Sequence, residues 1–422
     1  MVPLGRRARL GCEKRQRGET AGRPSATAGD QATREAAVRS VALPLDGVAS
    51  IQLVLYFTKG LDDVVAEEAA GIVPAATVRQ QDDRFLVLAV TAAEAARLGG
   101  QARTVDDARL LVAGPGRVGS EADFASLCAA AAGRVRDVLA PGSGHPSGPW
   151  SVTLSARNPV WRESPGWDPA PVLARYFAGA DLGATERSPV DLRVQADRDK
   201  VHIALNWCGR PAGRRADHEP ARPGALRPAV AAALVRLAIR DAGADRAARG
   251  VYDPFCGTGT VAAEAAHLGL PVFASDIDQR AVELTRRRLA AGLPGSAPAA
   301  AALLHRVFAH DVRRGPPARV SAGIVVGNMP WGKQVKVAGR LALFDATALL
   351  VSRLLADGGT AVLLTTREDA LMARLRRQRL EVSSRRIGLL GQAPAIVVAS
   401  AACRAGGQDR RRLREPVGGV LQ

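Results

Sequence analysis

The sequence predicts an α/β protein in which a doubly wound, mostly parallel sheet forms the C-terminal half and an α+β region precedes it. The chain has 422 residues, enough for two or three domains that each bury a core. Beyond residue 220, apolar strand-like runs alternate with helical patterns. This alternation is typical of a parallel sheet with helices on both faces. Before residue 220 the order of strands and helices is irregular, as in an α+β fold.

Runs rich in apolar and β-branched residues predict five strands in the N-terminal half, and two stretches have a helical pattern. The expected strands are residues 51–57, 84–90, 150–154, 190–195 and 200–205, and the expected helices are residues 61–70 and 124–139. Residues 196–199 form a turn between the last two strands. Residues 141–149, rich in Pro, Gly and Ser, form a linker.

The C-terminal half shows the strand and helix rhythm more regularly. The expected strands are residues 251–253, 271–275, 324–326, 360–364 and 395–399. Helices are expected around residues 230–237, over 261–267 and over 344–355, where apolar residues recur at i, i+4, i+7 and i+11. The polar, Pro-containing residues 209–224 separate the two halves, so we place a boundary near residue 220.

Both ends of the chain lack hydrophobic periodicity. Residues 1–48 mix Arg, Gly, Ser, Thr and Ala, and residues 404–422 are also basic. Such composition predicts disordered tails. The folded part is divided into segments 49–115, 116–220 and 221–403.

The charge of the chain favours a polyanionic partner. The formal net charge is +17, of which residues 1–50 contribute +4, residues 404–422 contribute +3, and residues 51–403 keep +10. Basic surfaces bind phosphate backbones through counterion release. A solvated Arg-rich surface without a nucleic-acid partner is the alternative, and charge alone leaves both open.

Cysteine usage and hydropathy predict a soluble, cytoplasmic protein without a metal site. The five cysteines are far apart, form no CxxC pair and have no His at zinc-ligand spacing, so we expect them to be reduced. No uncharged apolar stretch approaches the roughly 18 residues that a membrane span needs. The N-terminus has no apolar signal region.

The sharpest local motif is Asp-Pro-Phe-Cys-Gly-Thr-Gly-Thr at residues 253–260, between a predicted strand and a predicted helix. Gly257 and Gly259 let the backbone approach a ligand closely, and the helix N-terminus offers free amides. The motif suits a nucleoside-bearing cofactor with a carboxylate. Because the third glycine of the dinucleotide fingerprint is absent, a nicotinamide cofactor is disfavoured.

Two acidic residues follow at the expected ends of the next strands. Asp276 lies 19 residues after Gly257, where a carboxylate is expected to bind ribose hydroxyls. Asp311 comes after the following strand and can meet an adenine amine. A turn or helix-capping role for Asp311 is the alternative.

A second motif, Gly-Asn-Met-Pro-Trp-Gly at residues 327–332, follows the strand 324–326. Ligands bind at the carboxyl ends of strands in a doubly wound sheet, so this loop is expected to face the glycine loop. The Asn328 side-chain oxygen and the Pro330 carbonyl can accept hydrogen bonds from a planar exocyclic amine, and Trp331 can stack on its ring. The alternative is a structural Pro turn with a core Trp.

With these motifs in this order, the C-terminal half resembles the class I S-adenosylmethionine-dependent methyltransferases, which have a Rossmann-like fold. The resemblance implies S-adenosyl-L-methionine as cofactor and a catalytic group formed by Asn328, Pro330 and Trp331. It implies that the cofactor pocket is lined by Asp253, Phe255, Gly257, Gly259, Thr260, Asp276, Ile277, Asp311 and Asn328.

The version Asn-Met-Pro-Trp-Gly-Lys-Gln, together with residues 253–260, resembles the THUMP-domain guanine-N2 RNA methyltransferases. The resemblance covers residues 50–403, with diagnostic motifs in the C-terminal part and a similarity of pattern before it. It implies a ferredoxin-like segment at 49–115, a THUMP-like RNA-binding domain at 116–220 that docks the acceptor region of tRNA, and a methyltransferase domain at 221–403. The implied reaction is methyl transfer to the N2 amine of a guanosine in tRNA.

Other reactions are weighed against this one. Cys256 suggests a cytosine-C5 mechanism, but it lies in the cofactor loop, so we interpret it as a packing residue. An adenine-N6 enzyme, a protein glutamine-amide methyltransferase and an inactive RNA-binding protein are the alternatives. The α+β region before residue 220 and the charge of +10 on residues 51–403 favour a large polyanion over a protein substrate. A monomer is compatible with the sequence, which leaves open the oligomeric state, the modified nucleotide, mono- versus dimethylation and any accessory subunit.

Overall fold

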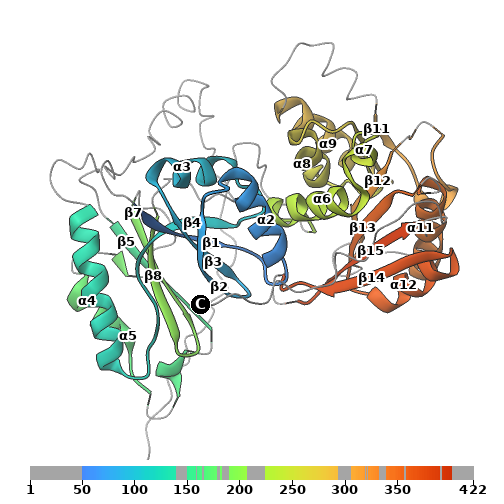
Figure 1. Ribbon diagram of the computed structural model, residues 1–422. Helices are drawn as coiled ribbons and strands as arrows, with labels where there is room; N and C mark the ends of the chain where they lie inside the picture. The colour runs from blue at the N-terminus through green and yellow to red at the C-terminus, as the bar shows by residue number, and fades with distance from the viewer. Residues whose placement is uncertain are drawn as a thin grey trace, which may run out of the picture. The chain divides into compact units, whose positions relative to one another are not determined.

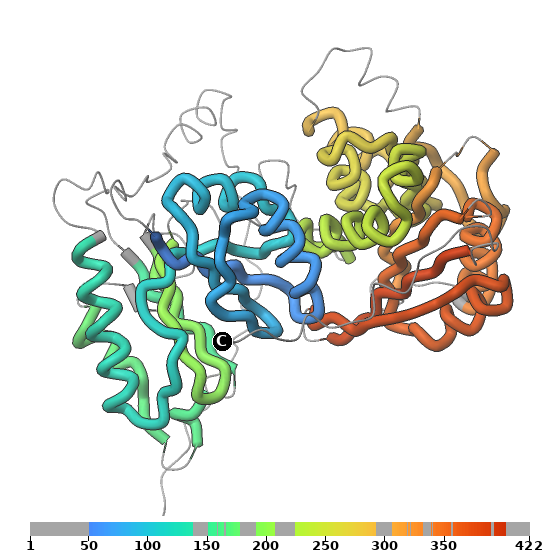
Figure 2. Tube along the Cα trace, in the orientation of Figure 1, coloured from blue at the N-terminus to red at the C-terminus, as the bar shows by residue number. Residues whose placement is uncertain are grey.

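The computed structural model describes residues 50–138, 150–157, 159–163, 166–177, 181–182, 190–206, 224–292, 306–318, 320, 322–331, 339–355, 358–389 and 392–401. Two β-sheets organise this part of the chain (Figures 1 and 2). The tails expected at 1–48 and 404–422 and the linker expected at 141–149 lie outside the described residues.

The first sheet begins with a ferredoxin-like unit. Its elements are β1 (Ile51–Tyr56), α2 (Asp62–Ile72), β2 (Thr77–Gln81), β3 (Phe85–Val90), α3 (Ala92–Gln101) and β4 (Asp107–Arg117). The strand order is β2-β3-β1-β4, and β1 pairs antiparallel with both β3 and β4. The chain order βαββαβ with this strand order is the ferredoxin-like arrangement expected for this segment.

A second α+β segment extends the same sheet. Its elements are α4 (Glu121–Val138), β5 (Trp150–Arg157), η1 (Val160–Arg162), α5 (Pro169–Tyr176), β6 (Asp181–Leu182), β7 (Val190–Asp197) and β8 (Lys200–Asn206). Strand β8 pairs with β4, which gives one eight-stranded sheet ordered β2-β3-β1-β4-β8-β7-β5-β6. The boundary expected between residues 115 and 116 therefore falls within β4.

The hairpin between β7 and β8 is tighter than predicted. Asp197 pairs with Lys200, so the turn consists of Arg198 and Asp199 rather than residues 196–199. Arg198 has a φ of 55°, the left-handed conformation that such two-residue turns require. The predicted first strand was too short, because Ala196 and the polar residue Asp197 still pair with β8.

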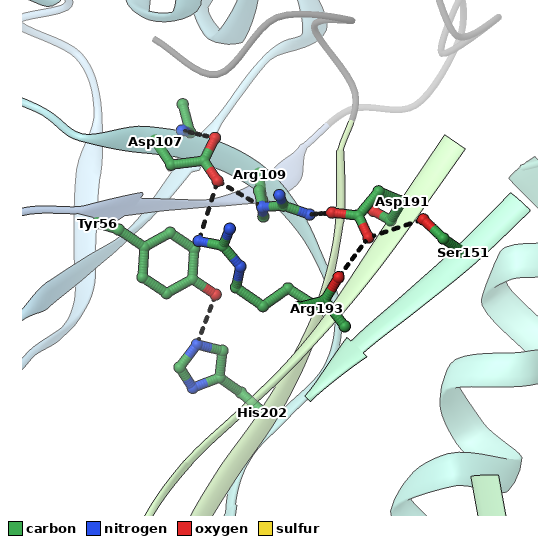
Figure 3. A network of polar contacts seen from close by, with 9 residues as sticks. Tyr56, Asp107, Arg109, Ser151, Asp191, Arg193 and His202 are labelled. Carbon is green, nitrogen blue, oxygen red and sulfur yellow. Dashed lines mark hydrogen bonds and ion pairs between the residues drawn. The ribbon is translucent and has the colours of Figure 1, made fainter. Parts of the chain in front are cut away.

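A buried ionic cluster joins the two segments of this sheet (Figure 3). Arg109 on β4 is only 1% exposed and pairs with Asp107 at 2.6 Å and with Asp191 of β7 at 2.8 Å. Arg193 pairs with Asp107 at 3.2 Å, and its guanidinium lies 5.6 Å from the centre of the Tyr56 ring. Because each buried charge has an opposite charge beside it, the cluster holds β1, β4 and β7 in one register.

His202 on β8 lies beside this cluster in an uncharged form. Its Nε2 is 2.8 Å from the Tyr56 hydroxyl, and the two rings are stacked with centroids 5.7 Å apart. Burial lowers the pKa of His202 to about 4, because the surroundings cannot solvate an imidazolium. The folded sheet therefore excludes the protonated form.

The domain is expected to lose stability as the pH falls below the ordinary histidine pKa. The unfolded chain protonates His202 near pH 6.5, whereas the folded state resists protonation down to about pH 4. The contribution of His202 to the free energy of unfolding is thus complete above pH 6.5 and is reduced by about 2 kcal/mol at pH 5. Urea unfolding of wild type and His202→Gln at pH 7.5 and pH 5 tests this. An equal loss in both proteins would mean that other groups cause the pH dependence.

The second sheet forms the C-terminal half. Its elements are α6 (Pro228–Ala242), α7 (Ala244–Ala247), β9 (Val251–Asp253), α8 (Thr260–His267), β10 (Val272–Asp276), α9 (Gln279–Gly292), β11 (Val307–Ala309), η2 (Val312–Arg314), β12 (Ile324–Asn328), α11 (Arg340–Leu354), β13 (Thr360–Thr365), α12 (Glu368–Arg377), β14 (Leu380–Arg386) and β15 (Ala395–Ala401). The order is β11-β10-β9-β12-β13-β15-β14, parallel from β11 to β13, with β15 antiparallel to both neighbours.

Helices cover both faces of this sheet. One apolar cluster joins the strands to α6, α8 and α9, and includes Val230, Val261 and Val282. The other joins them to α11 and α12, and includes Phe344 and Leu371. Strands buried on both faces read as continuous apolar runs, which is why they were recognisable in the sequence. The predicted doubly wound, Rossmann-like fold is confirmed.

Candidate active site

The topology places a crevice between β9 and β12. The chain proceeds from β9 outward to β10 and β11, and then returns to add β12 on the other side of β9. Such a switch point leaves a crevice at the carboxyl ends of the two strands. The glycine loop follows β9, and Asn328 ends β12. Both motifs therefore lie at the same edge of the sheet.

Close packing around Gly327 confirms that the two motifs are neighbours. A Cβ atom built on Gly327 would lie 3.3 Å from the Phe255 ring and 3.5 Å from Asp253 Oδ1. A side chain at residue 327 would push against the glycine loop, so the short residue permits this approach. Asn328 follows directly in the chain and ends the same strand.

The glycine loop has the backbone that its sequence predicts. Gly257 and Gly259 have φ values of 52° and 76°, in the left-handed region that glycine adopts without strain. A Cβ on Gly259 would also lie 3.0 Å from Thr285 of α9. Thr260 opens α8, and its hydroxyl accepts a hydrogen bond from Arg288 at 2.8 Å. The loop therefore brings its backbone to the N-terminus of α8 as a fixed turn.

Asp276 ends β10 and contacts the glycine loop directly. Its Oδ2 accepts a hydrogen bond from the Gly257 amide and its Oδ1 one from the Asp278 amide, both at 3.0 Å. Burial raises its pKa. Each carboxylate oxygen has a second lone pair, so both retain capacity for a ribose hydroxyl. Next to it, Ile277 is 63% exposed, and its contact with a ligand stays a prediction.

Asp253 places a second carboxyl group under the loop. It is 1% exposed, and its Oδ1 accepts a hydrogen bond from the Phe255 amide at 3.1 Å. Burial, together with the negative charge of Asp276, raises the pKa of Asp253 to about 8. With a pKa near 8, this carboxyl group is largely protonated at neutral pH, and a cation bound beside it would favour its ionised form.

Asp311 follows β11 and is occupied by its own neighbour. Its carboxylate accepts a hydrogen bond from the Arg313 amide at 3.0 Å, which caps η2, and pairs with Arg313 Nε at 2.9 Å. This arrangement corresponds to the capping alternative. A contact between Asp311 and an adenine amine stays a prediction.

Asn328 presents a hydrogen-bond acceptor without a donor. Its Nδ2 donates to the Gly224 carbonyl at 3.3 Å, while its Oδ1 is buried and has no partner in the described part of the chain. Met329 is fully buried, and its amide donates to the Leu364 carbonyl at 3.0 Å, which fixes the loop on β13. A buried acceptor without a donor is costly, so it is expected to meet a ligand donor such as an amine.

Trp331 is partly buried and packs against the apolar cluster that contains α6. Its indole Nε1 is buried and likewise has no partner within the described ranges. Pro330, between Met329 and Trp331, is partly buried. This packing agrees with the core-Trp alternative, and stacking of Trp331 on a base stays a prediction.

Cys256 has the surroundings of a packing residue. It is 4% exposed, and its Sγ lies 3.3 Å from the Thr285 hydroxyl. Burial raises the pKa of the thiol far above its usual value. Since the thiolate is the nucleophilic form, these surroundings oppose covalent attack on a pyrimidine ring.

A pocket at the carboxyl end of β13 was not foreseen from the sequence. It has a volume of about 380 Å³ and lies at the carboxyl end of β13, the strand that pairs with β12 on the side away from β9. Its walls are formed by Thr366, Arg367, Glu368, Asp369, Ala370, Arg386, Ala393 and Ala395. None of these residues belongs to the glycine loop or to the loop at residues 327–332.

Neither a metal-binding group nor a membrane-spanning helix is found among the described residues. No group of three or more His, Cys, Asp or Glu side chains among them is arranged to hold a metal ion. None of the described helices is both long and apolar enough to cross a bilayer.

The doubly wound sheet, the glycine loop at its switch point and the Asn-x-Pro-aromatic loop beside it define a Rossmann-like methyltransferase domain. More particularly, residues 214–393 match the family described as RMKL-like, methyltransferase domain. The class predicted for the C-terminal half is thereby confirmed.

Two curated relatives are similar in sequence. The chain is 34% identical over 201 residues to a tRNA (guanine(6)-N2)-methyltransferase of Thermus thermophilus, which covers 46% of this chain and 55% of the relative. It is 45% identical over 67 residues to a tRNA (guanine(10)-N2)-dimethyltransferase of Methanothermobacter thermautotrophicus. This match covers 16% of this chain and 18% of the relative. The matched region thus spans about half of the first relative and less of the second.

The fold of both halves has a solved counterpart. The crystal structure of TrmN from Thermus thermophilus superposes with a TM-score of 0.64 at 23% sequence identity, covering 83% of this chain and 100% of that chain. Because the superposition covers so much of this chain, the arrangement of an α+β half before the methyltransferase domain is shared.

Proposed function

We propose that this chain transfers a methyl group from S-adenosylmethionine to the N2 amine of a guanosine in tRNA. The carrying observation is the buried Oδ1 of Asn328, which has no partner among the described residues and lies at the end of β12, the strand next to β9 and its glycine loop. An acceptor at this place can hold an amine next to the cofactor. The relatives named as tRNA guanine-N2 enzymes support guanine as the base.

The residues around the glycine loop fit S-adenosylmethionine. Asp253 and Asp276 place two carboxyl groups beside the glycine loop, and the exposed Ile277 would offer an apolar surface for an adenine ring. When bound, the cofactor supplies a methyl group on a positively charged sulfur. Asp276 would hold the ribose hydroxyls, and the backbone of residues 257–259 would border the ligand.

The catalytic loop acts by orientation. An exocyclic amine needs no covalent activation by the protein, because its nitrogen has a lone pair that can be directed. Asn328 Oδ1 and the Pro330 carbonyl would accept the two amine hydrogens and thereby point that lone pair at the methyl group. The inert surroundings of Cys256 agree with this direct transfer.

The N-terminal half would supply the RNA platform. The ferredoxin-like unit precedes residues 116–220, which we propose to be a THUMP-like domain that docks the acceptor region of tRNA. The charge of +10 on residues 51–403 supports a polyanionic partner. A cytoplasmic location follows from that substrate.

Replacement of Asp276 by Ala is expected to weaken S-adenosylmethionine binding by about 1–3 kcal/mol, the loss typical of a buried hydrogen-bond partner. Calorimetry on the purified variant measures the change. Asp278→Asn is the companion variant, because Asp278 lies two residues away and its carboxylate accepts a hydrogen bond from the Arg280 amide at the start of α9. Unchanged affinity for Asp276→Ala would mean that another acid holds the ribose.

A direct test of the activity uses methyl-labelled S-adenosylmethionine and bulk tRNA with the full chain. Transfer of label to RNA supports the proposed function. Label that stays with the cofactor, in the presence of intact cofactor binding, would favour an inactive RNA-binding protein.

A further inference from the structure

We propose that Arg227 and Gly224 are positioning residues that fix which atom of the Asn328 amide faces the substrate, and that the ferredoxin-like unit anchors them. The inference rests on the proposed function, because it assigns Asn328 the role of acceptor.

An asparagine amide can present either of two chemically opposite atoms. The oxygen accepts a hydrogen bond from an amine, whereas the nitrogen only donates and would repel it. In this structure Asn328 Nδ2 donates to the Gly224 carbonyl at 3.3 Å, and Oδ1 is left without a partner among the described residues. Turning the amide over would bring Oδ1 against that carbonyl oxygen. The Gly224 carbonyl therefore selects the accepting orientation.

The direction of this carbonyl depends on an unusual backbone. Gly224 has a φ of 90°, a conformation that residues with a side chain rarely adopt. It lies three residues before Arg227, the N-cap residue of α6, and 104 residues before Asn328. The backbone of residues 224–227 thus directs the Gly224 carbonyl toward Asn328 at the end of β12.

Arg227 fastens this segment to the ferredoxin-like unit. Its Nη2 donates to the Thr58 hydroxyl at 2.8 Å, and its Nη1 pairs with Asp106 at 3.2 Å. The Thr58 hydroxyl in turn lies 3.4 Å from Asp106 Oδ2, so the three side chains form a closed triangle. Thr58 follows β1 and is 2% exposed, and Asp106 precedes β4. Both anchors therefore lie directly beside strands of the first sheet.

These contacts form a continuous connection from the N-terminal half to the candidate catalytic residue. The anchors hold Arg227, the short segment carries the constraint to Gly224, and its carbonyl orients Asn328. A small displacement at a reacting group can lower a rate by up to about 100-fold. Loss of Arg227 is accordingly expected to affect the chemical step through Asn328 while leaving the glycine loop unchanged.

The chain offers a matched control on the same helix. Arg240 lies near the other end of α6 and pairs with Asp63 of α2 at 2.8 Å. Its side chain is 37% exposed, close to the 39% of Arg227. Both residues join α6 to the ferredoxin-like unit, but no contact leads from Arg240 to Asn328 in the described part of the structure.

The experiment compares Arg227→Met, Arg240→Met and wild type in single-turnover methyl transfer to tRNA, with cofactor affinity measured in parallel. We expect Arg227→Met to slow transfer by about 10- to 100-fold and to leave cofactor affinity within a few-fold. Arg240→Met should react at nearly the wild-type rate. Thr58→Val removes one hydrogen bond to Arg227 and keeps the ion pair of Arg227 with Asp106, so it should slow methyl transfer less. This variant replaces Arg227→Met in the comparison if Arg227→Met fails to fold.

A double variant separates positioning from a general structural effect. In an Asn328→Ala background, Arg227→Met should cause no further loss, because the group that it orients is absent. Equal losses in Arg227→Met and Arg240→Met, or additive losses in the double variant, would overturn the inference. A wild-type chain without methyl transfer would instead contradict the proposed function, so the two failures are distinguishable.

Discussion

Asn328→Ala is expected to lower the rate of methyl transfer by about 100-fold or more while S-adenosylmethionine affinity stays within a few-fold of wild type. Asn328 Oδ1 is the buried acceptor that would hold the amine in line with the methyl group. The carboxylate proposed to bind the ribose, Asp276, lies at the end of a different strand. Removing the amide should therefore affect orientation in the transition state and spare cofactor binding.

Single-turnover kinetics and calorimetry on the same preparation measure both quantities. Asn328→Asp is the informative companion, because it keeps an oxygen acceptor but replaces the amide NH2 that donates to Gly224. It should retain more activity than Asn328→Ala. An Asn328→Ala enzyme with normal turnover would remove this loop from the mechanism.

Arg109→Leu is expected to destabilise the N-terminal half by about 3–5 kcal/mol. Arg109 lies between Asp107 and Asp191, which are 4% and 2% exposed. Without the Arg109 guanidinium, the two buried carboxylates would lose the cation that both of them contact. Urea unfolding at neutral pH measures the loss.

Arg117→Leu provides the comparison for this prediction. Arg117 lies on the same strand and pairs with Asp199, but its side chain is 85% exposed. Ion pairs in solvent contribute little, so its replacement should hardly change the unfolding midpoint. Similar losses in both variants would mean that the strand tolerates no apolar replacement, and that the buried cluster is not the cause.

Burial explains part of the success of the sequence analysis, although β4 was missed while its first seven residues are buried. Strands β9, β12 and β13 are buried on both faces, so each left a continuous apolar run that was recognised. Strand β2 was missed because four of its five residues are exposed and its sequence, Thr-Val-Arg-Gln-Gln, has no apolar alternation. Strand β14, Leu-Glu-Val-Ser-Ser-Arg-Arg, was missed for the same reason at the opposite edge of the other sheet.

The candidate site was predictable where its residues are close in sequence. The glycine loop and the Asn328 loop are local motifs, and the parallel topology alone placed them together. Contacts between distant residues could not be derived, as the bond from Asn328 to Gly224 and the pairing of Arg227 with Asp106 illustrate. The capping of η2 by Asp311 could be predicted from the local sequence, because its partner Arg313 follows two residues later.

The measurement that tests the central claim most directly is nucleoside analysis of the methylated product. Purified chain, methyl-labelled S-adenosylmethionine and bulk tRNA are incubated, the RNA is digested, and the labelled nucleosides are identified by mass. The account predicts label in N2-methylguanosine with the wild-type chain and a strong reduction of that product with Asn328→Ala. Label found instead in N6-methyladenosine or 5-methylcytidine would contradict it.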